Sequence, residues 1–203
     1  NCEKRFERFY ELTKNKIVIL HSRWTFKMYP IPNYIDNLTF TNSKGGKEFE
    51  YYRTFNFYSS NKSSTDELTD KRFALNEYIE KLSLNANKVL FIGPVPEVGW
   101  DVNKINTKNY LFKNRTIKNI FFPYEDFIYR NRFILEEIKK FKKFSNLLII
   151  RPDKLFCNTF IKNNCVAQYN YLPFYVDEDH LSTHGSDIVV EEVLKTLDKI
   201  NIP

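Results

Sequence analysis

The chain has 203 residues, of which 42% are hydrophobic and 17% aromatic, and its formal net charge is +6. This length suits one domain with a substantial core, and the sequence contains neither an apolar run long enough to cross a bilayer nor a secretion signal at Asn1. The lysines that create the positive charge are spread along the chain, without a recognition helix, zinc-finger spacing or RNA-binding signature. We therefore predict a solvated basic surface and no nucleic-acid partner, with affinity for acidic glycans or an anionic membrane surface left open.

The first half of the sequence predicts a helix and a short buried strand, followed by an irregular region. Residues 2–14 carry aromatic and aliphatic side chains at helical spacing, and the apolar run 16–20 is typical of a strand buried on both faces. Pro30 and Pro32 argue against a helix immediately after this strand. Residues 33–66 are polar and aromatic, which predicts an insertion or hairpin.

The remainder alternates helices with short, continuously apolar strands. Helical patterns cover residues 70–82, 127–144 and 186–200, the strands are 88–92 and 146–150, and an Asn- and Lys-rich loop precedes residue 127. Such alternation is typical of a parallel sheet covered on both sides. We predict the α/β class, as a single three-layer α/β/α domain with a mainly parallel sheet that spans residues 1–203.

In an open parallel sheet, ligands bind beyond the carboxyl ends of the strands. These ends carry His21–Trp24, Gly93–Pro96 and Arg151–Asp153. An edge strand within residues 172–176 would bring the stretch YVDEDHLSTHG, residues 175–185, to the same side. The sequence therefore predicts one polar rim at which a site forms.

Asp177 and His180 lie three residues apart within this stretch. On a helical turn this spacing stacks the two side chains, so that the carboxylate accepts the Nδ1–H and leaves Nε2 free to take a proton from a hydroxyl nucleophile. The alternative is that Asp177 and Asp179 cap the following helix and that His180 is a surface residue.

His180 and His184 also have the i, i+4 spacing of a metal-binding pair. Leu181 occupies the place of a metalloprotease's general-base Glu, and Gly185 interrupts a helix at this point. We therefore predict no metal and place His184 in the first turn of the last helix.

The three cysteines form an odd set. Cys157 and Cys165 lie close together in a polar stretch without the further Cys or His residues that a zinc site needs, which favours a local disulfide and an oxidising compartment. Cys2 is left without an evident partner.

Four stretches resemble the SGNH (GDSL-type) hydrolases, in particular the SGNH domains fused to acyltransferase family 3 membrane proteins. YVDEDHLSTHG resembles the family's last block, Asp-x-x-His-Leu-Ser-x-x-Gly, and VILHSRW, IGPVPEVGWDV and RPDKLFCNTFIKNNC resemble earlier blocks in the correct order. The resemblance implies a flavodoxin-like topology in which Asp177 and His180 are the acid and base of a Ser-His-Asp triad.

Two departures accompany the resemblance. The family's nucleophilic serine belongs to a Gly-Asp-Ser block after its first strand, and no such block occurs here. We expect that the sequence is N-terminally truncated and lacks that strand, which would also explain Cys2; the alternative nucleophile is Ser22. The place of the family's Gly-x-Asn-Asp block is taken by Ser22, Arg23 and Trp24, which are candidates for oxyanion or substrate binding. The alternative interpretation is that Arg23 forms a salt bridge and that Trp24 belongs to the core.

The resemblance implies a catalytic module that O-acetylates bacterial cell-surface polysaccharide or lipopolysaccharide, without a cofactor. The implied partners are an acyl donor, a glycan acceptor and a membrane acyltransferase domain fused to or paired with the chain, on the periplasmic or extracytoplasmic side. The alternatives are a carbohydrate esterase and a catalytically inactive glycan-binding module.

Overall fold

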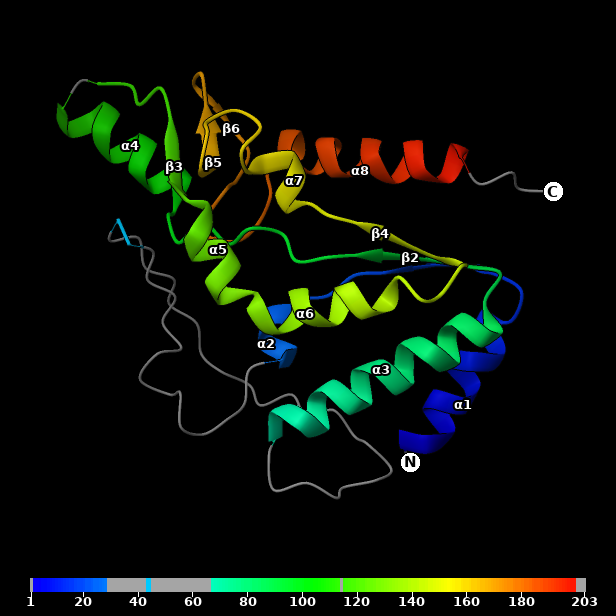
Figure 1. Cartoon of the computed structure of the whole chain (residues 1–203). Coiled ribbons are helices and arrows are strands. Elements are labelled where there is room, and N and C mark those ends of the chain that lie inside the picture. Colours follow the sequence, from blue (N-terminus) through cyan, green and yellow to red (C-terminus); the bar gives the residue numbers. More distant parts are fainter. Residues whose placement is uncertain (1, 29–42, 45–66, 114, 200–203) are drawn as a thin grey trace. The chain divides into compact units, whose positions relative to one another are not determined.

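The computed structural model describes residues 2–28, 43–44, 67–113 and 115–199 (Figure 1). The chain forms two compact units and passes between them repeatedly. The first unit comprises Asn1–Asn33, Arg53–Pro94 and Asn131–Ile150, and the second comprises Tyr34–Tyr52, Val95–Arg130 and Arg151–Pro203. The predicted insertion at residues 33–66 lies outside the described residues except for a turn at 43–44. None of the described helices has the length and hydropathy that a membrane span requires.

The first unit contains a parallel sheet in the order β1-β2-β4, formed by β1 (Ile17–Leu20), β2 (Lys88–Ile92) and β4 (Leu147–Ile150). These are the three predicted strands, so the α/β class with a parallel sheet is confirmed. β2 has partners on both sides and its last four residues are buried. β1 departs from the prediction of full burial: it pairs only with β2 among the described residues, and Ile19 is 51% exposed.

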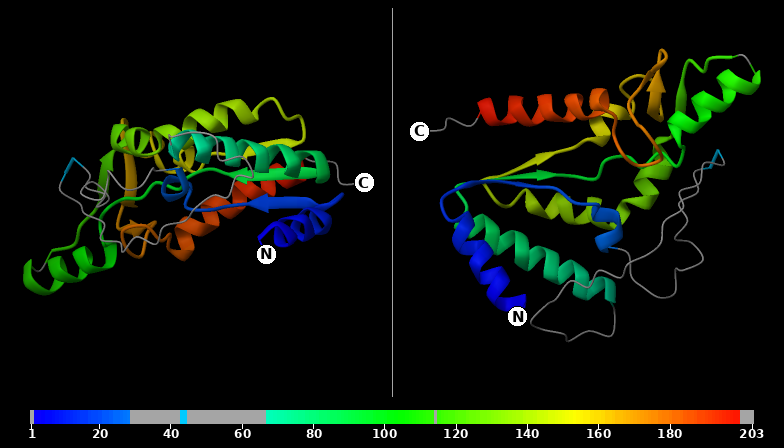
Figure 2. Two further views of the ribbon diagram at one scale, coloured as in Figure 1. Left: turned by 90° about the horizontal axis from the view of Figure 1, so that it is seen from below. Right: turned by 180° about the vertical axis from the view of Figure 1, so that it is seen from behind.

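The helices of the first unit are α1 (Cys2–Thr13), α2 (Trp24–Met28), α3 (Glu67–Asn85) and α6 (Arg132–Phe141). Figures 1 and 2 show α3 and α6 on one side of the three strands. Their inward faces provide much of the core: Leu75, Ile79, Leu82, Ile134, Ile138 and Phe141. The prediction that no helix directly follows β1 was wrong, because the short α2 ends before Pro30 is reached.

The second unit differs most from the prediction. Its elements are α4 (Val102–Lys113), β3 (Ile120–Pro123), α5 (Tyr124–Arg130), α7 (Asp153–Phe156), β5 (Asn164–Tyr169), β6 (Leu172–Pro173) and α8 (Thr183–Asp198). The predicted Asn- and Lys-rich loop is largely the helix α4. β3, β5 and β6 form an antiparallel sheet, so the expected edge strand at 172–176 is the short β6, which pairs with β5.

The predicted disulfide between Cys157 and Cys165 is present. Cys165 belongs to β5 rather than to a loop, and Cys157 forms an isolated antiparallel bridge with it. The two half-cystines are 2% and 0% exposed. The bond therefore joins the end of α7 to the antiparallel sheet within the core of the second unit.

Replacing both cysteines by alanine should lower the free energy of unfolding by about 2–3 kcal/mol, because the unfolded chain is released from a closed loop of this length. Denaturant titration of the wild type and of the double variant measures the difference. In a reductant strong enough to cleave the bond during unfolding, the two proteins should become nearly equal. A difference that persists under reduction would attribute the effect to packing instead.

Candidate active site

The loop between β6 and α8 is closed at its base by backbone pairing. Tyr175 and Leu181 form an antiparallel bridge, and the Val176 N–H donates to the His180 carbonyl at 2.9 Å. Tyr175 is fully buried, and its hydroxyl donates to the Pro96 carbonyl at 2.6 Å. The loop thus projects from a buried base instead of continuing a helix.

Asp177 organises the tip of this loop. Its Oδ1 accepts hydrogen bonds from the backbone N–H groups of Asp179, at 3.0 Å, and His180, at 2.7 Å. This is an Asx-type turn, in which a side-chain oxygen replaces a backbone acceptor. The expected contact between Asp177 and His180 is therefore present, but the predicted helical turn was wrong, because residues 176–179 form bends before α8 begins.

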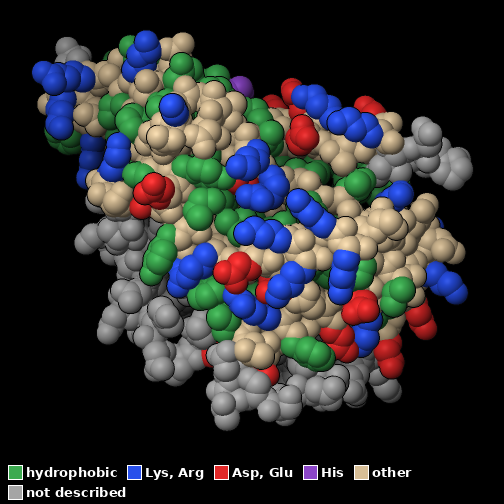
Figure 3. Space-filling view, viewed as in Figure 1, with side chains coloured by type: hydrophobic (Ala, Val, Ile, Leu, Met, Phe, Trp, Pro, Cys, Tyr) green, Lys and Arg blue, Asp and Glu red, His purple; other side chains and the backbone are tan. Residues whose placement is uncertain are grey.

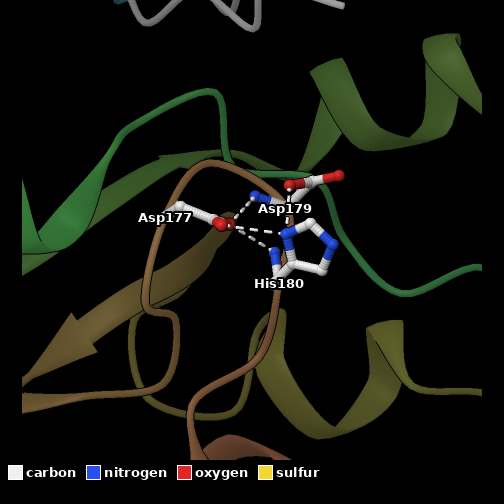
Figure 4. A group of neighbouring side chains, drawn as sticks. All are labelled: Asp177, Asp179 and His180. Carbon is white, nitrogen blue, oxygen red and sulfur yellow. Dashed lines mark hydrogen bonds and ion pairs between the residues drawn. The ribbon is translucent and has the colours of Figure 1, made fainter.

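The His180 imidazole is held by two carboxylates (Figure 4). Its Nδ1 lies 2.9 Å from Asp177 Oδ2 and 2.9 Å from Asp179 Oδ1. The side chain of Asp179 is 6% exposed, that of Asp177 is 35% exposed, and that of His180 is 71% exposed. In Figure 4 the other ring nitrogen, Nε2, points away from both carboxylates. A proton on Nδ1 is thereby bound on the protein side, and Nε2 can act as a base.

The charges around the loop support this tautomer. Partial burial raises the pKa of Asp177, but the backbone N–H groups of Asp179 and His180 and the His180 ring together lower the pKa below its ordinary value. Asp177 therefore stays ionised through the neutral range. Burial raises the pKa of Tyr175 well above 10.0, with further contributions from the charges of Glu97 and Asp179, so its hydroxyl stays protonated and donates to Pro96.

A second segment supports the tip of the loop from outside. The N–H groups of Val98 and Gly99 both donate to the Glu178 carbonyl, at 2.8 and 3.1 Å. Gly99 has φ 67°, a conformation that glycine adopts without a steric cost. The IGPVPEVGW stretch thus contributes backbone donors that fix the peptide between the two aspartates.

The start of α8 fixes the other end of the loop. Ser182 is the N-cap: its Oγ accepts from the Gly185 N–H at 3.1 Å and donates to the Pro173 carbonyl at 2.8 Å. A Cβ on Gly185 would lie 2.1 Å from the Phe174 carbonyl oxygen. Only glycine permits this approach of α8 to the residue that follows β6, and Gly185 lies within α8 instead of interrupting it.

His184 lies in the first turn of α8, as predicted, and stacks on Phe174 at 5.2 Å between ring centroids. His180 precedes this helix, so the two imidazoles do not share a helical face as a metal pair would. Ligand atoms of Asp177, Asp179 and His180 do lie within 4.8 Å of one another, but the hydrogen bonds described above account for that proximity.

The other predicted site residues, Ser22, Arg23 and Trp24, belong to the first unit and follow β1. Trp24 is 3% exposed; its ring stacks on Phe91 at 4.5 Å, and its Nε1–H donates to the Ile92 carbonyl at 2.7 Å. These contacts favour the alternative of a core tryptophan. Ser22 and Arg23 are partly exposed, and the Ser22 carbonyl accepts from the Trp24 N–H.

Comparison with known proteins shows the family of the chain. The family model described as SGNH domain (fused to AT3 domains) matches residues 1–195. The chain belongs to this family. No curated protein and no solved structure matches it.

The chain is thus an SGNH module of the kind associated with membrane acyltransferases. The general chemistry of such modules is the formation or cleavage of esters. The sequence pointed to Asp177 and His180 and missed the role of Asp179 as a second carboxylate on the same ring nitrogen. Its signal was available in the run Asp-Glu-Asp immediately before His180, but the contact depends on the turn that Asp177 makes.

Because two carboxylates share Nδ1, neither aspartate alone should account for the orientation of the ring. We expect Asp179→Asn to lower kcat/KM about tenfold and Asp177→Asn about 10²-fold, whereas the double variant should lose about 10⁴-fold. Kinetics of ester cleavage or acyl transfer by the full-length protein measure the series. Equal rates for Asp177→Asn and the double variant would show that Asp179 takes no part.

Gly185→Ala should lower the free energy of unfolding by at least about 1–3 kcal/mol, because the added methyl group overlaps the Phe174 carbonyl and α8 must move. Val190→Ala, at a 51% exposed position of the same helix, is the matched control and should change it little. Thermal or denaturant unfolding of both variants provides the comparison. Equal stabilities would contradict the close approach of α8 to Phe174.

Proposed function

We propose that this SGNH module is the catalytic part of an O-acyltransferase that transfers acyl, in particular acetyl, groups to bacterial cell-surface polysaccharide or lipopolysaccharide. The observation that carries the proposal is the His180 ring, which is held at Nδ1 by two carboxylates with Nε2 pointing away from them. Such a ring is suited to move a proton between a hydroxyl group and a leaving group. Membership of a family whose domains are fused to acyltransferase domains supports this use.

The proposed reaction has two steps that share one base. In the first, a serine hydroxyl attacks the acyl carbonyl of the donor while His180 Nε2 takes its proton, and the donor's leaving group departs with that proton. In the second, His180 takes a proton from a sugar hydroxyl, which attacks the acyl-serine and releases the serine. The two carboxylates stabilise the imidazolium that forms in each step. With water as the acceptor the same steps give an esterase.

The serine in this scheme is that of the family's Gly-Asp-Ser block, which the 203 residues do not contain. The unpaired edge of β1, with Ile19 half exposed, offers a position for its strand among the described residues. Parallel strands are ordinarily covered on both sides, and an apolar edge left open promotes aggregation. Ser22, which directly follows β1 and His21, is the alternative nucleophile, and Arg23 is a candidate contact for an acidic substrate.

The disulfide supports an extracytoplasmic location, since such bonds persist in oxidising compartments. A membrane acyltransferase domain as partner follows from the fusion that the family description names. A second candidate function, a glycan-binding module without catalysis, is favoured by the absence of Gly-Asp-Ser from the sequence. The coding sequence upstream of Asn1 separates the two: a Gly-Asp-Ser after an apolar strand supports the enzyme.

His180→Ala in the full-length protein should abolish acetylation, with a loss on the order of 10⁴-fold or more, because no other described group is held as a base at this loop. Mass spectrometry of the cell-surface glycan measures transfer, and thermal unfolding verifies that the variant folds. His184→Ala is the matched control, since its ring stacks on Phe174; this variant should retain transfer. Acetylation by His180→Ala at the wild-type level would refute the proposal.

A further inference from the structure

The second unit has a shallow pocket of about 370 Å³ that the proposed reaction does not use. It lies where α4 meets the segment before β3 and the β5–β6 hairpin. Among its lining residues are Asn106, Thr107, Tyr110, Thr116, Gln168 and Tyr171. None of its lining residues is a Lys, Arg, Asp or Glu, although the chain carries a net charge of +6. The pocket is therefore suited to a ligand without charge.

The floor of the pocket is a fixed amide pair. Gln168 is 1% exposed; its Oε1 accepts from Asn106 Nδ2 at 2.5 Å, and its Nε2 donates to the Ile117 carbonyl. Asn106 thereby has a set orientation, while its Oδ1 accepts no hydrogen bond from the described residues. Within the same part of the chain, no protein group bonds to the hydroxyls of Thr107 or Thr116. The pocket thus offers pre-oriented acceptors and donors to a ligand.

Two exposed aromatic rings flank these polar groups. Tyr110 is 65% exposed and Tyr171 is 58% exposed. An aromatic face carries partial negative charge and is apolar, whereas its hydroxyl can donate and accept. The combination of aromatic faces, a side-chain amide and hydroxyls without charged groups matches a sugar ring, which has an apolar C–H face and a rim of hydroxyls. Binding sites commonly pair apolar walls with a few placed polar groups.

The backbone at Tyr171 provides an independent observation. Asn170 and Tyr171 are the two turn residues of the β5–β6 hairpin and have φ 54° and 69°. A two-residue hairpin of this kind prefers Asn-Gly, and a bulky side chain in the left-handed region is a genuine outlier. The turn therefore holds an aromatic residue where glycine would be less strained. Strained backbone conformations of this kind cluster at ligand-binding and other functional sites.

The helix α4 connects the pocket to the base of the candidate active site. The Asn103 N–H donates to the Val176 carbonyl at 3.4 Å, at the base of the Asp177–His180 loop. From Asn103 to Asn106 and Tyr110 the helix rises about 5–10 Å along its axis. An oligosaccharide can extend over such a distance, whereas an acetyl group cannot.

We propose that this pocket binds a carbohydrate chain, and, resting on the function proposed above, that it holds the acceptor glycan while a hydroxyl further along is acylated. Tyr110 and Tyr171 contact the apolar faces of sugar units, and Asn106 and the threonines bond to their hydroxyls. The pocket sets which glycan is used and does not take part in the chemical steps.

The test uses the full-length protein and the envelope polysaccharide of the producing cell, stripped of ester-linked acyl groups by mild alkali. Saturation-transfer NMR measures binding without any need for turnover. Tyr110→Ala and Tyr171→Gly should each weaken binding about tenfold or more, as expected for an aromatic contact. Hydrolysis of the small ester 4-nitrophenyl acetate should be unchanged. Tyr171→Gly should also raise the melting temperature, because it relieves the left-handed strain.

The matched control is Phe112→Ala, which removes a ring that is 81% exposed on the same helix but does not line the pocket. It should bind the polysaccharide as the wild type does. Unchanged polysaccharide binding by both tyrosine variants would overturn the proposal. So would variants that lose attachment to anionic phospholipid vesicles but keep polysaccharide binding, because this result would identify a membrane-facing patch. A wild type that binds the polysaccharide but acylates nothing would refute the proposed function and leave the carbohydrate site standing.

Discussion

The geometry of the candidate active site depends on the two oxygens of one carboxylate. Asp177 Oδ1 turns the backbone by accepting from the next residues, and Oδ2 binds the ring of the histidine that this turn brings back. The same turn places Asp179 against the ring from the buried side. A four-residue stretch thus encodes both the position of the imidazole and its tautomer, and the surrounding fold needs only to hold the ends of the loop. Catalytic residues on loops of a rigid scaffold follow this general pattern.

The tip of the loop and the start of α8 are held largely by backbone atoms. The Glu178 carbonyl takes two N–H donors from the segment after β2, and the Phe174 carbonyl takes the Ser182 N–H while Gly185 packs against it. Contacts between backbone groups immobilise no long side chain, so they position the loop without the additional loss of side-chain entropy. The His180 side chain is 71% exposed, yet its ring is oriented through the contacts at Nδ1.

Much of the first unit could be predicted because its signals are local. The runs KVLFI and NLLII are continuously apolar, and the helices that cover them have apolar residues at helical spacing. α4 was missed because Val102 is its one buried residue among those described, and its hydrophobic residues Tyr110, Leu111 and Phe112 are consecutive and exposed. The face that α4 partly buries consists of Val102, Ile105, Asn106 and Asn109, and because two of these four are polar, the burial leaves no apolar periodicity in the sequence.

The remaining errors in the predicted structure concern features that depend on contacts between residues far apart in the sequence. Trp24 could be read as a sugar platform until its ring was found stacked on Phe91, from a strand far away in the sequence. β3 and β5 pair although they are far apart in the sequence, and each strand is too short for its residue pattern to predict an antiparallel sheet. The Asp177–His180 contact was predictable from spacing, but the helical turn was not the structure that produces it. A side chain that bonds to its own backbone competes with helix formation, and here it prevails.

The disulfide extends this dependence on local geometry into the core of the second unit. Phe156, next to Cys157, is fully buried and meets Phe174 at 5.8 Å and Tyr175 at 6.0 Å between ring centroids. Phe174 and Tyr175 are in turn the base from which the Asp177–His180 loop projects. Left-handed asparagines at 158 and 163 flank the two half-cystines, so the intervening backbone is irregular and has little secondary structure to hold it. Covalent closure therefore constrains the layer of aromatic rings beneath the candidate active site, which connects the disulfide to the geometry of the Asp177–His180 loop.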